Sequence, residues 1–92
     1  MHHELKILPC YFDAVKRGDK TFEIRDNSDR GFQKGDTITL REYDPSIAPV
    51  DSFRYTGMKV EAEITYVTGY AQKDGYVVFS FKEFSCTTSS ST

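Results

Sequence analysis

The sequence lacks tryptophan and has little cysteine, with only Cys10 and Cys86 in 92 residues. Two cysteines are too few for a disulfide framework, so we expect a reducing, cytoplasmic environment. No group of Cys and His residues has the spacing of a metal site, and we expect neither a metal nor another cofactor. No apolar run approaches the roughly 20 residues that cross a membrane, and no charged-then-apolar leader indicates secretion. These absences predict a cytoplasmic protein without membrane contact.

The sequence also lacks the excess of positive charge found in proteins that track long stretches of nucleic acid. Its 12 Lys and Arg residues face 14 Asp and Glu residues, which gives a formal net charge of −2. This balance excludes a broad phosphate-binding surface but still allows a small basic pocket. With 38% hydrophobic and 28% charged residues, the composition is typical of a globular domain rather than of a disordered chain.

A chain of 92 residues is long enough for one domain with a single modest core. We place this domain at residues 1–84. Residues 85–92 are serine and threonine apart from one cysteine, so we expect this tail to be disordered.

Short apolar–polar alternations run through most of the domain, and they predict β-strands. One helix is expected near the start, because Pro9 suits a first helical turn and Gly18 suits a helix end. Residues 53–57 fit either a short strand or the end of the loop before them. The predicted order is strand 4–8, helix 9–17, and strands 20–25, 37–43, 58–67 and 76–84. This order indicates a mostly β (α+β) fold, a small barrel of about five or six strands with one or two short helices.

Two of the predicted strands carry further information about their positions. Glu42 falls on the same face as Ile38 and Leu40, and a carboxylate that continues a core face indicates the mouth of a barrel or a cleft. This interpretation requires that the strand has no bulge before Glu42. The strand at 76–84 starts with apolar residues on both faces, which favours a central, covered position in the sheet.

The densest group of chemically active residues lies at the predicted helix-to-strand corner. Phe22 and Ile24 share one face of the strand, while Glu23 and Arg25 share the other, about 7 Å apart. Together with Lys20, this carboxylate and guanidinium could hold a planar polar ligand, since one accepts and the other donates hydrogen bonds. The alternative is a solvated strand face with a surface ion pair that contributes about 0–1 kcal/mol.

Further candidates are scattered along the chain. His3 could contact a ligand or transfer a proton, but next to His2 it equally fits a disordered or expression-derived terminus. Lys6 alternates outward on the first strand, where a solvated lysine is the ordinary alternative. Tyr43 and Tyr55 offer rings on which a base could stack, although most aromatic residues in so small a domain belong to its core.

Several motifs give the chain a resemblance to a known family. Gly18, Lys20, Glu23 and Arg25 match the G-x-K-x-x-E-x-R signature of the ASCH (activating signal cointegrator homology) domain. The chain is similar to a small bacterial and phage-borne subfamily of such proteins over roughly residues 3–84. The other matching segments are His3-Glu4-Leu5-Lys6, Tyr11-Phe12, Phe32, Gly35-Asp36, Leu40-Arg41-Glu42-Tyr43-Asp44-Pro45, Tyr55-Thr56-Gly57 and Gly75-Tyr76-Val77-Val78.

The resemblance implies a PUA-like pseudo-barrel with a helix closing one side, and RNA as the ligand. In the family the signature lines a cleft between barrel and helix. The charged residues that would form the walls of this cleft here are His3, Lys6, Lys20, Glu23, Arg25 and Glu42. The alternative is that Glu23 and Arg25 form a structural ion pair that positions the loop at 26–31.

These residues lead to a first hypothesis, a module that binds one nucleotide or a short single-stranded RNA segment. Lys20 and Arg25 would contact phosphate or base carbonyl oxygens. Glu23 would accept a hydrogen bond from the amino group of a base, as carboxylates do for cytosine. Tyr55 or Tyr43 would stack on the base. A pocket that reads one splayed base suits a protein without a basic surface.

Two other hypotheses remain open. One branch of the ASCH family resembles an amidohydrolase that deacylates acetylated cytidine, with a lysine at the position of Lys20 and a nucleophilic threonine where this chain has Glu23. In such an enzyme Lys20 would transfer a proton or stabilise an oxyanion, and Glu23 would act as general base. Thr21 is not a clean substitute for the threonine. The family's second glutamate has no secure counterpart among Glu42, Glu61 and Glu63. The last hypothesis is a protein-interaction module with an apolar patch, whose partner the sequence does not identify.

Overall fold

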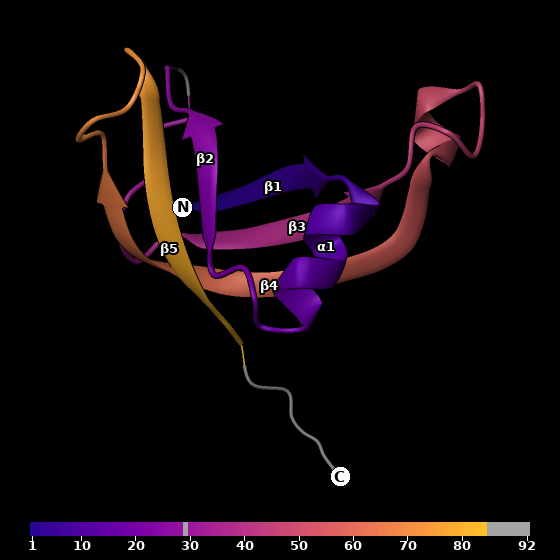
Figure 1. Cartoon of the computed structure of the whole chain (residues 1–92), viewed down its shortest axis with the longest axis horizontal. Coiled ribbons are helices and arrows are strands. Elements are labelled where there is room, and N and C mark those ends of the chain that lie inside the picture. Colours follow the sequence, from indigo (N-terminus) through magenta and orange to yellow (C-terminus); the bar gives the residue numbers. More distant parts are fainter. Residues whose placement is uncertain (29, 85–92) are drawn as a thin grey trace, which may run out of the picture.

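A computed structural model describes residues 1–28 and 30–84 of the chain (Figure 1). The tail at 85–92, for which we expect disorder, lies outside the described residues. The mostly β fold is confirmed, with five strands, one short helix and one 3-10 turn. No helix in the described ranges is long and apolar enough to cross a lipid bilayer. The elements are β1 (His2–Ile7), α1 (Pro9–Lys16), β2 (Phe22–Asp26), β3 (Thr37–Tyr43), η1 (Asp51–Phe53), β4 (Tyr55–Thr68) and β5 (Tyr76–Glu83).

The five strands form one mixed sheet in the order β1-β3-β4-β5-β2. β1 pairs in parallel with β3, and the other neighbours are antiparallel. The sheet curves strongly. The long strand β4 passes under the helix, and the two edge strands, β1 and β2, lie on the same side of β4 (Figure 1). The pairing shifts register in β3–β4 and again in β4–β5, and such bulges bend strands. The result is a half-barrel whose edges, β1 and β2, face each other. β5 occupies an inner position, as its apolar start predicts.

The concave side of the half-barrel holds the hydrophobic core, which α1 covers. Phe12 and Val15, three residues apart on the helix, are both buried against it. Pro9 begins the helix, and Gly18 follows its end with a φ of +81°, a conformation that glycine adopts without strain. The other core side chains come from β1, β3, β4 and β5 and, with Phe32, from the loop after β2, namely Leu5, Ile7, Phe32, Ile38, Leu40, Val60, Ala62, Ile64, Phe79 and Phe81.

Strand β2 is oriented with its charged side inward and its apolar side outward. Glu23 is only 5% exposed, whereas Phe22 and Ile24 are 43% and 52% exposed. The alternation predicted for this strand is therefore confirmed, but the interpretation of its charged side as a solvated face is wrong. Burying a carboxylate is costly unless it is paired, so this inversion directs attention to the partners of Glu23.

The gap between the two edge strands is spanned by arginine side chains. Arg25 on β2 donates from Nη2 to the carbonyl oxygen of Lys6 at 2.9 Å. Arg30, in the loop after β2, donates to the carbonyl oxygen of Glu4 at 3.3 Å. Both acceptors belong to β1, whose outer edge would otherwise present free backbone groups. The seam of the half-barrel is thus closed in part by guanidinium groups, and the space beside Arg25 stays open.

Beyond the barrel, β3 and β4 are joined by a protruding arm, residues 44–54 (Figure 1). Residues 53–57, which the sequence left open, form the end of η1 and the start of β4. Arg54 stabilises the arm by donating to the carbonyl oxygens of Ala48 (2.6 Å) and Pro49 (3.3 Å) and to the hydroxyl of Tyr43 (3.3 Å). Tyr43 in turn donates a short hydrogen bond to Asp51. The arm is therefore fixed to the last residue of β3.

Candidate binding cleft

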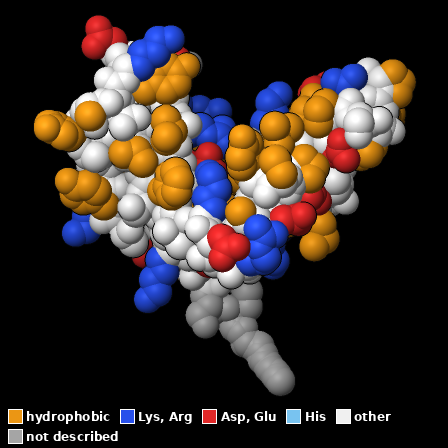
Figure 2. All heavy atoms as spheres, in the orientation of Figure 1, with side chains coloured by type: hydrophobic (Ala, Val, Ile, Leu, Met, Phe, Trp, Pro, Cys, Tyr) orange, Lys and Arg blue, Asp and Glu red, His pale blue; other side chains and the backbone are white. Residues whose placement is uncertain are grey.

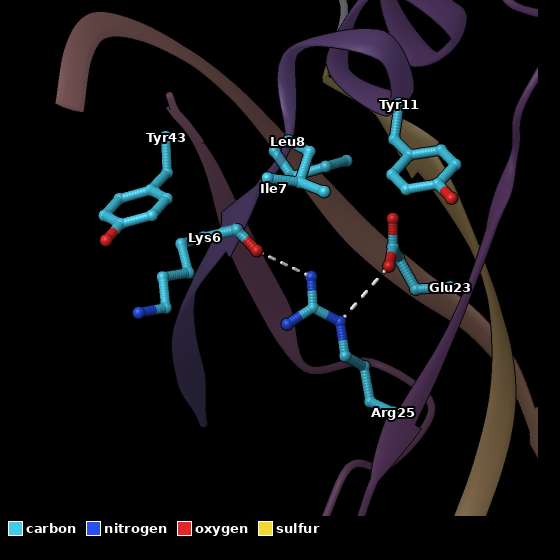
Figure 3. Close-up of a pocket in the computed structure, with 7 residues that line it drawn as sticks. All are labelled: Lys6, Ile7, Leu8, Tyr11, Glu23, Arg25 and Tyr43. Carbon is cyan, nitrogen blue, oxygen red and sulfur yellow. Dashed lines mark hydrogen bonds and ion pairs between the residues drawn. The ribbon is translucent and has the colours of Figure 1, made fainter. Parts of the chain in front are cut away.

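The open part of the seam is a cleft between the end of β1, the start of α1 and β2, with a volume of about 380 Å³. This volume lies in the range of small-ligand sites, roughly 300–1,000 Å³. Figure 2 shows the corresponding notch in the surface, with charged side chains in its floor and hydrophobic side chains on both walls. The lining residues, drawn in Figure 3, are Lys6, Ile7, Leu8, Tyr11, Glu23, Arg25 and Tyr43.

The carboxylate of Glu23 lies in the floor of the cleft, held by two cations. Lys20 Nζ is 2.5 Å from one carboxylate oxygen, and Arg25 Nε is 3.2 Å from the other. Lys20 also donates to the carbonyl oxygen of Phe22 at 2.8 Å. A carboxylate with both oxygens bonded to cations is well compensated for its burial. The triad of Lys20, Glu23 and Arg25 is therefore held together by its own ion pairs. Strand spacing predicted the Glu23–Arg25 pair, and the clustering of charged residues at this corner added Lys20.

Arg25 keeps part of its hydrogen-bonding capacity free for a ligand. Its Nε serves Glu23 and its Nη2 serves the carbonyl of Lys6, whereas Nη1 has no hydrogen-bond partner among residues 1–28 and 30–84. Figure 3 shows this nitrogen on the side of the cleft where Lys6 and Tyr43 lie. A guanidinium held by two bonds and open at the third nitrogen is pre-oriented for a phosphate or carbonyl oxygen.

Tyrosines stand at the two ends of the cleft, with a lysine beside one of them (Figure 3). Lys6 Nζ lies 4.6 Å from the centre of the Tyr43 ring, and it forms no ion pair with any described residue. Tyr43 is buried and fixed by the arm, while Tyr11 on α1 is half exposed. Exposed edges and faces of such rings can stack on a flat ligand.

The charge of this region is opposite to that of the whole protein. The triad and Lys6 together comprise three cations and one carboxylate, which leaves a formal excess of two positive charges. The whole chain carries −2. The cleft is thus the small basic pocket on an acidic body that the composition still allowed.

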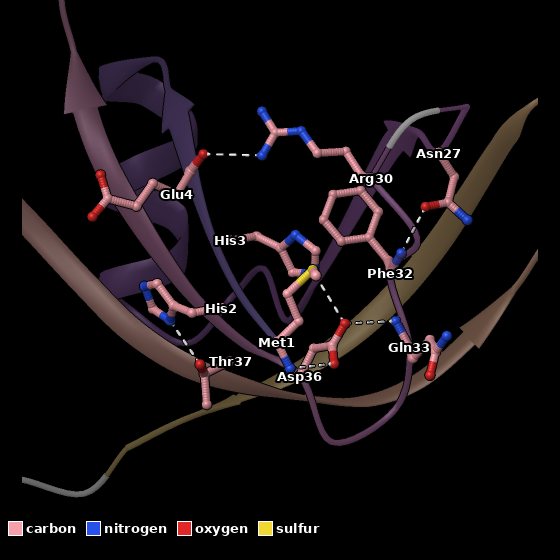
Figure 4. A network of polar contacts seen from close by, with 10 residues as sticks. All are labelled: Met1, His2, His3, Glu4, Asn27, Arg30, Phe32, Gln33, Asp36 and Thr37. Atoms are coloured by element: carbon pink, nitrogen blue, oxygen red, sulfur yellow. Dashed lines mark hydrogen bonds and ion pairs between the residues drawn. The ribbon is translucent and has the colours of Figure 1, made fainter.

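The structure places four of the predicted site residues outside the lining of the cleft. Lys20 lines a neighbouring groove and meets the cleft only through its ion pair with Glu23. His3 lies farther away. Its side chain is buried at the other end of β1, where Nε2 donates to Asp36 at 2.9 Å and the ring packs on Phe32 at 4.6 Å (Figure 4). Asp36 also accepts from the Met1 amino group and from the backbone amide of Gln33. Burial alone would raise the pKa of Asp36, but these hydrogen bonds outweigh it and hold the pKa below its usual value.

Glu42 and Tyr55 line a separate, smaller pocket of about 240 Å³ near the base of the arm. The strand does bulge between Arg41 and Tyr43, which was the condition that would remove Glu42 from the core face. Glu42 accepts a hydrogen bond from the Thr56 hydroxyl at 2.7 Å, and Arg41 stacks on the Tyr55 ring at 4.1 Å. The single cleft expected for these residues is therefore divided, with Glu42 and Tyr55 in the smaller pocket.

Sequence reasoning missed Leu8 and Tyr11, which form the helical wall of the cleft. Both are about half exposed although they belong to an apolar segment. An exposed tyrosine beside the buried Phe12 was the available signal, because one face of so short a helix suffices for the core. Among the described residues, no three His, Cys, Asp or Glu side chains converge as metal ligands would.

Fold and cleft together define a small half-barrel β protein with a cationic site at its seam. The chain belongs to the family described as Domain of unknown function (DUF3850), whose model matches residues 2–81. It is also similar to the "Uncharacterized 12.9 kDa protein in GpA 3'region" of Escherichia phage P2, with 42% identity over 66 residues. The match covers 72% of this chain and 53% of the phage protein, so the chain spans about half the length of that relative.

Proposed function

We propose that this DUF3850 protein is an ASCH-like module that binds single-stranded RNA by holding one nucleotide in the cleft at the seam. The observation that carries the proposal is the Lys20–Glu23–Arg25 triad, a buried carboxylate clamped by two cations in a cleft with tyrosines at both ends. The resemblance of these residues to the ASCH signature favours RNA over other anions.

The roles of the residues follow from their positions. Arg25 Nη1 and Lys6 Nζ are the groups free to donate to phosphate or base carbonyl oxygens. Tyr11 and Tyr43 flank the space for a base. Glu23 orients the two cations. Since its oxygens already serve Lys20 and Arg25, we assign it a positioning role in place of base recognition.

Binding is the function that the geometry supports better than hydrolysis. An amidohydrolase needs a nucleophile within hydrogen-bond reach of its base. Thr21 is exposed and lines neither the cleft nor the neighbouring groove on the other side of Glu23. No other Ser or Thr among the described residues lines either space. Lys20 and Glu23 are bonded to each other. We therefore do not propose a catalytic mechanism.

The test is an NMR titration of the nitrogen-labelled protein with short single-stranded RNA, single-stranded DNA, mononucleotides and acetylcytidine, with product monitored in the same tubes. We expect RNA to shift the amides of Lys6, Tyr11 and Arg25, with a slope of log affinity against log salt of about −2 or shallower. No shifts at the cleft with any nucleic acid would overturn the proposal. Product from acetylcytidine would replace it with hydrolysis.

Variants of two lysines distinguish RNA binding at a specific cleft from a general attraction of RNA to positive charge. Lys6 lies in the cleft without an ion-pair partner, while Lys59 is exposed on β4 beside Glu61. Lys6→Ala should weaken RNA binding about three- to tenfold, since it removes one charged contact to phosphate while the backbone carbonyl that receives Arg25 remains. Lys59→Ala should leave affinity within twofold. Equal losses in the two variants would contradict a specific site.

A further inference from the structure

A second groove lies on the other side of Glu23. Its volume is about 360 Å³, and it is lined by Tyr11, Lys20, Phe22, Glu23 and Ile24. Tyr11 and Glu23 also line the cleft described above. The two spaces are therefore adjacent compartments that share a wall of one tyrosine ring and one carboxylate. We call them the cleft and the β2 groove.

The β2 groove has a different chemical character from the cleft. The cleft holds the free donors of Lys6 and Arg25, whereas the β2 groove is walled by the apolar side chains of Phe22 and Ile24. Because β2 is an edge strand, the groove reaches residues of both its faces, the inward Glu23 and the outward pair. The groove therefore combines a flat apolar wall with the ion pair in its floor.

Lys20 is placed to serve a ligand that passes between the two compartments. Its ammonium lies 5.1 Å from the centre of the Phe22 ring and 5.6 Å from that of Tyr11, besides its contact with Glu23. A cation between two aromatic rings at a shared wall suits an anionic group that links two flat groups. A nucleic acid strand has this pattern, with a phosphate between successive bases.

Resting on the proposed function, we propose that the cleft and the β2 groove are consecutive nucleotide sites and that the ligand is a single strand of at least two nucleotides. One base occupies the cleft between the tyrosines, with its phosphate on Arg25 and Lys6. The neighbouring base packs on Phe22 and Ile24. The phosphate that links them lies near Lys20. Each compartment is large enough for one small ligand group, and a ligand confined to the cleft would leave the exposed apolar side of β2 uncovered.

The experiment measures affinity against length, using RNA of one, two and four nucleotides by calorimetry and NMR. Stacking one additional base on an aromatic wall corresponds to about tenfold in affinity or more. We expect this gain from one to two nucleotides and little from two to four, with the second nucleotide shifting the amides of Phe22 and Ile24. Equal affinity for mononucleotide and dinucleotide would overturn the inference.

Variants of the β2 groove test the same point while the cleft stays intact. Phe22→Leu removes the ring but keeps an apolar side chain, and should abolish most of the gain from the second nucleotide while mononucleotide affinity stays within twofold. Ile24→Ala is a second variant with the same expectation, usable if the first disturbs β2. Phe53→Leu, an exposed residue of the arm, is the control and should retain the full gain.

The two proposals fail in distinguishable ways. No binding of RNA of any length would remove the proposed function itself. Mononucleotide binding in the cleft without any gain from a second nucleotide would leave the function and remove only the inference about the β2 groove. Shifts at Phe22 and Ile24 caused by an apolar peptide, but by no dinucleotide, would also overturn it and would assign the groove to a protein partner.

Discussion

Among the residues that the structure describes, two carboxylates are nearly buried, yet their surroundings differ in a way that distinguishes a structural network from a candidate binding site. Glu23 and Asp36 are 5% and 8% exposed, and each accepts hydrogen bonds from two or more groups. The partners of Asp36 include the buried His3, whose ring packs on Phe32. The partners of Glu23 are two long cations at the margin of an open cleft, one of which retains free donors.

The difference teaches that burial and pairing alone do not identify a binding site. In the Asp36 network the imidazole is enclosed and one donor is a backbone amide, so the network joins the starts of β1 and β3. In the Glu23 network the hydrogen bonds fix the direction of two cations, and Arg25 keeps one nitrogen that no described residue uses. The first arrangement stabilises the fold, and the second pre-organises contacts that a ligand can complete.

The largest effect on stability should come from breaking the enclosed network. Asp36→Ala leaves the His3 ring buried without its acceptor and the Gln33 amide without a partner. Hydrogen bonds to a buried charged group contribute about 1.5–3 kcal/mol each, and their loss is partly relieved by water. We expect the free energy of unfolding in urea to fall by about 2–4 kcal/mol, while the folded fraction still binds RNA normally. A loss of binding at full stability would reverse the assignment of the two networks.

How much of the fold could be predicted from the sequence depends on what the alternation of apolar and polar residues specifies. Period-two patterns located the strands, and Pro9 and Gly18 bounded the helix. The same pattern says which residues share a face but not which face points inward. On composition alone Phe22 would face the core and Glu23 the solvent, and the structure has the reverse because β2 is an edge strand beside a cleft.

The site was predicted where its members are close in sequence and missed where tertiary structure assembles it. Strand geometry paired Glu23 with Arg25, and Lys20 joined them because it lies in the same corner and in the ASCH-like signature. Tyr11 reaches the cleft from a helix whose packing against the sheet no local pattern specifies. Glu42 was placed on the core face because the bulge that redirects it leaves no clear mark in the sequence.

The largest effect on binding should come from Arg25, with Arg30 as its matched control. Both arginines donate to carbonyl oxygens of β1 across the seam, but only Arg25 lines the cleft and bonds Glu23. Arg25→Ala should reduce RNA affinity at least tenfold in a calorimetric titration, since it removes an oriented, charged donor. Arg30→Ala should leave affinity within twofold. Similar losses in both variants would mean that closure of the seam, and not the cleft, controls binding.

Acid provides a smaller and reversible test of the enclosed network. Because the pKa of Asp36 is lower in the folded protein than its ordinary 3.8, folding favours the ionised form. This contribution to stability is present above that ordinary value and is lost as pH falls from about 5 through the folded-state pKa. Urea unfolding between pH 7 and pH 3 should therefore show a steeper acid decline in the wild type than in Asp36→Asn.

Comparing the pH profiles of the wild type and Asp36→Asn separates the effect of Asp36 from that of the carboxylates that both proteins share. Hydrogen bonds from Ser28 and Ser46 lower the pKa values of Asp26 and Asp44, and both of these groups are present in wild type and variant alike. Their contribution cancels in the difference between the two pH profiles. Parallel profiles would show that ionisation of Asp36 does not stabilise the fold.

The smallest effect on stability should follow from neutralising the other carboxylate. In Glu23→Gln one side-chain oxygen still accepts a hydrogen bond, and Lys20 and Arg25 are exposed enough to turn toward water, unlike the buried His3. We expect a loss of about 1–2 kcal/mol in urea unfolding, smaller than for Asp36→Ala, because weaker hydrogen bonds replace those to the charged group while both cations gain water. The charge excess of the region would rise from two to three, so phosphate-containing ligands should bind a few-fold more tightly at low salt, with a steeper salt dependence. Weaker binding would mean that the orientation of the cations by Glu23 matters more than the charge it cancels. A stability loss equal to that of Asp36→Asn at pH 7 would show that both carboxylates are structural, which would remove the distinction drawn between the two networks.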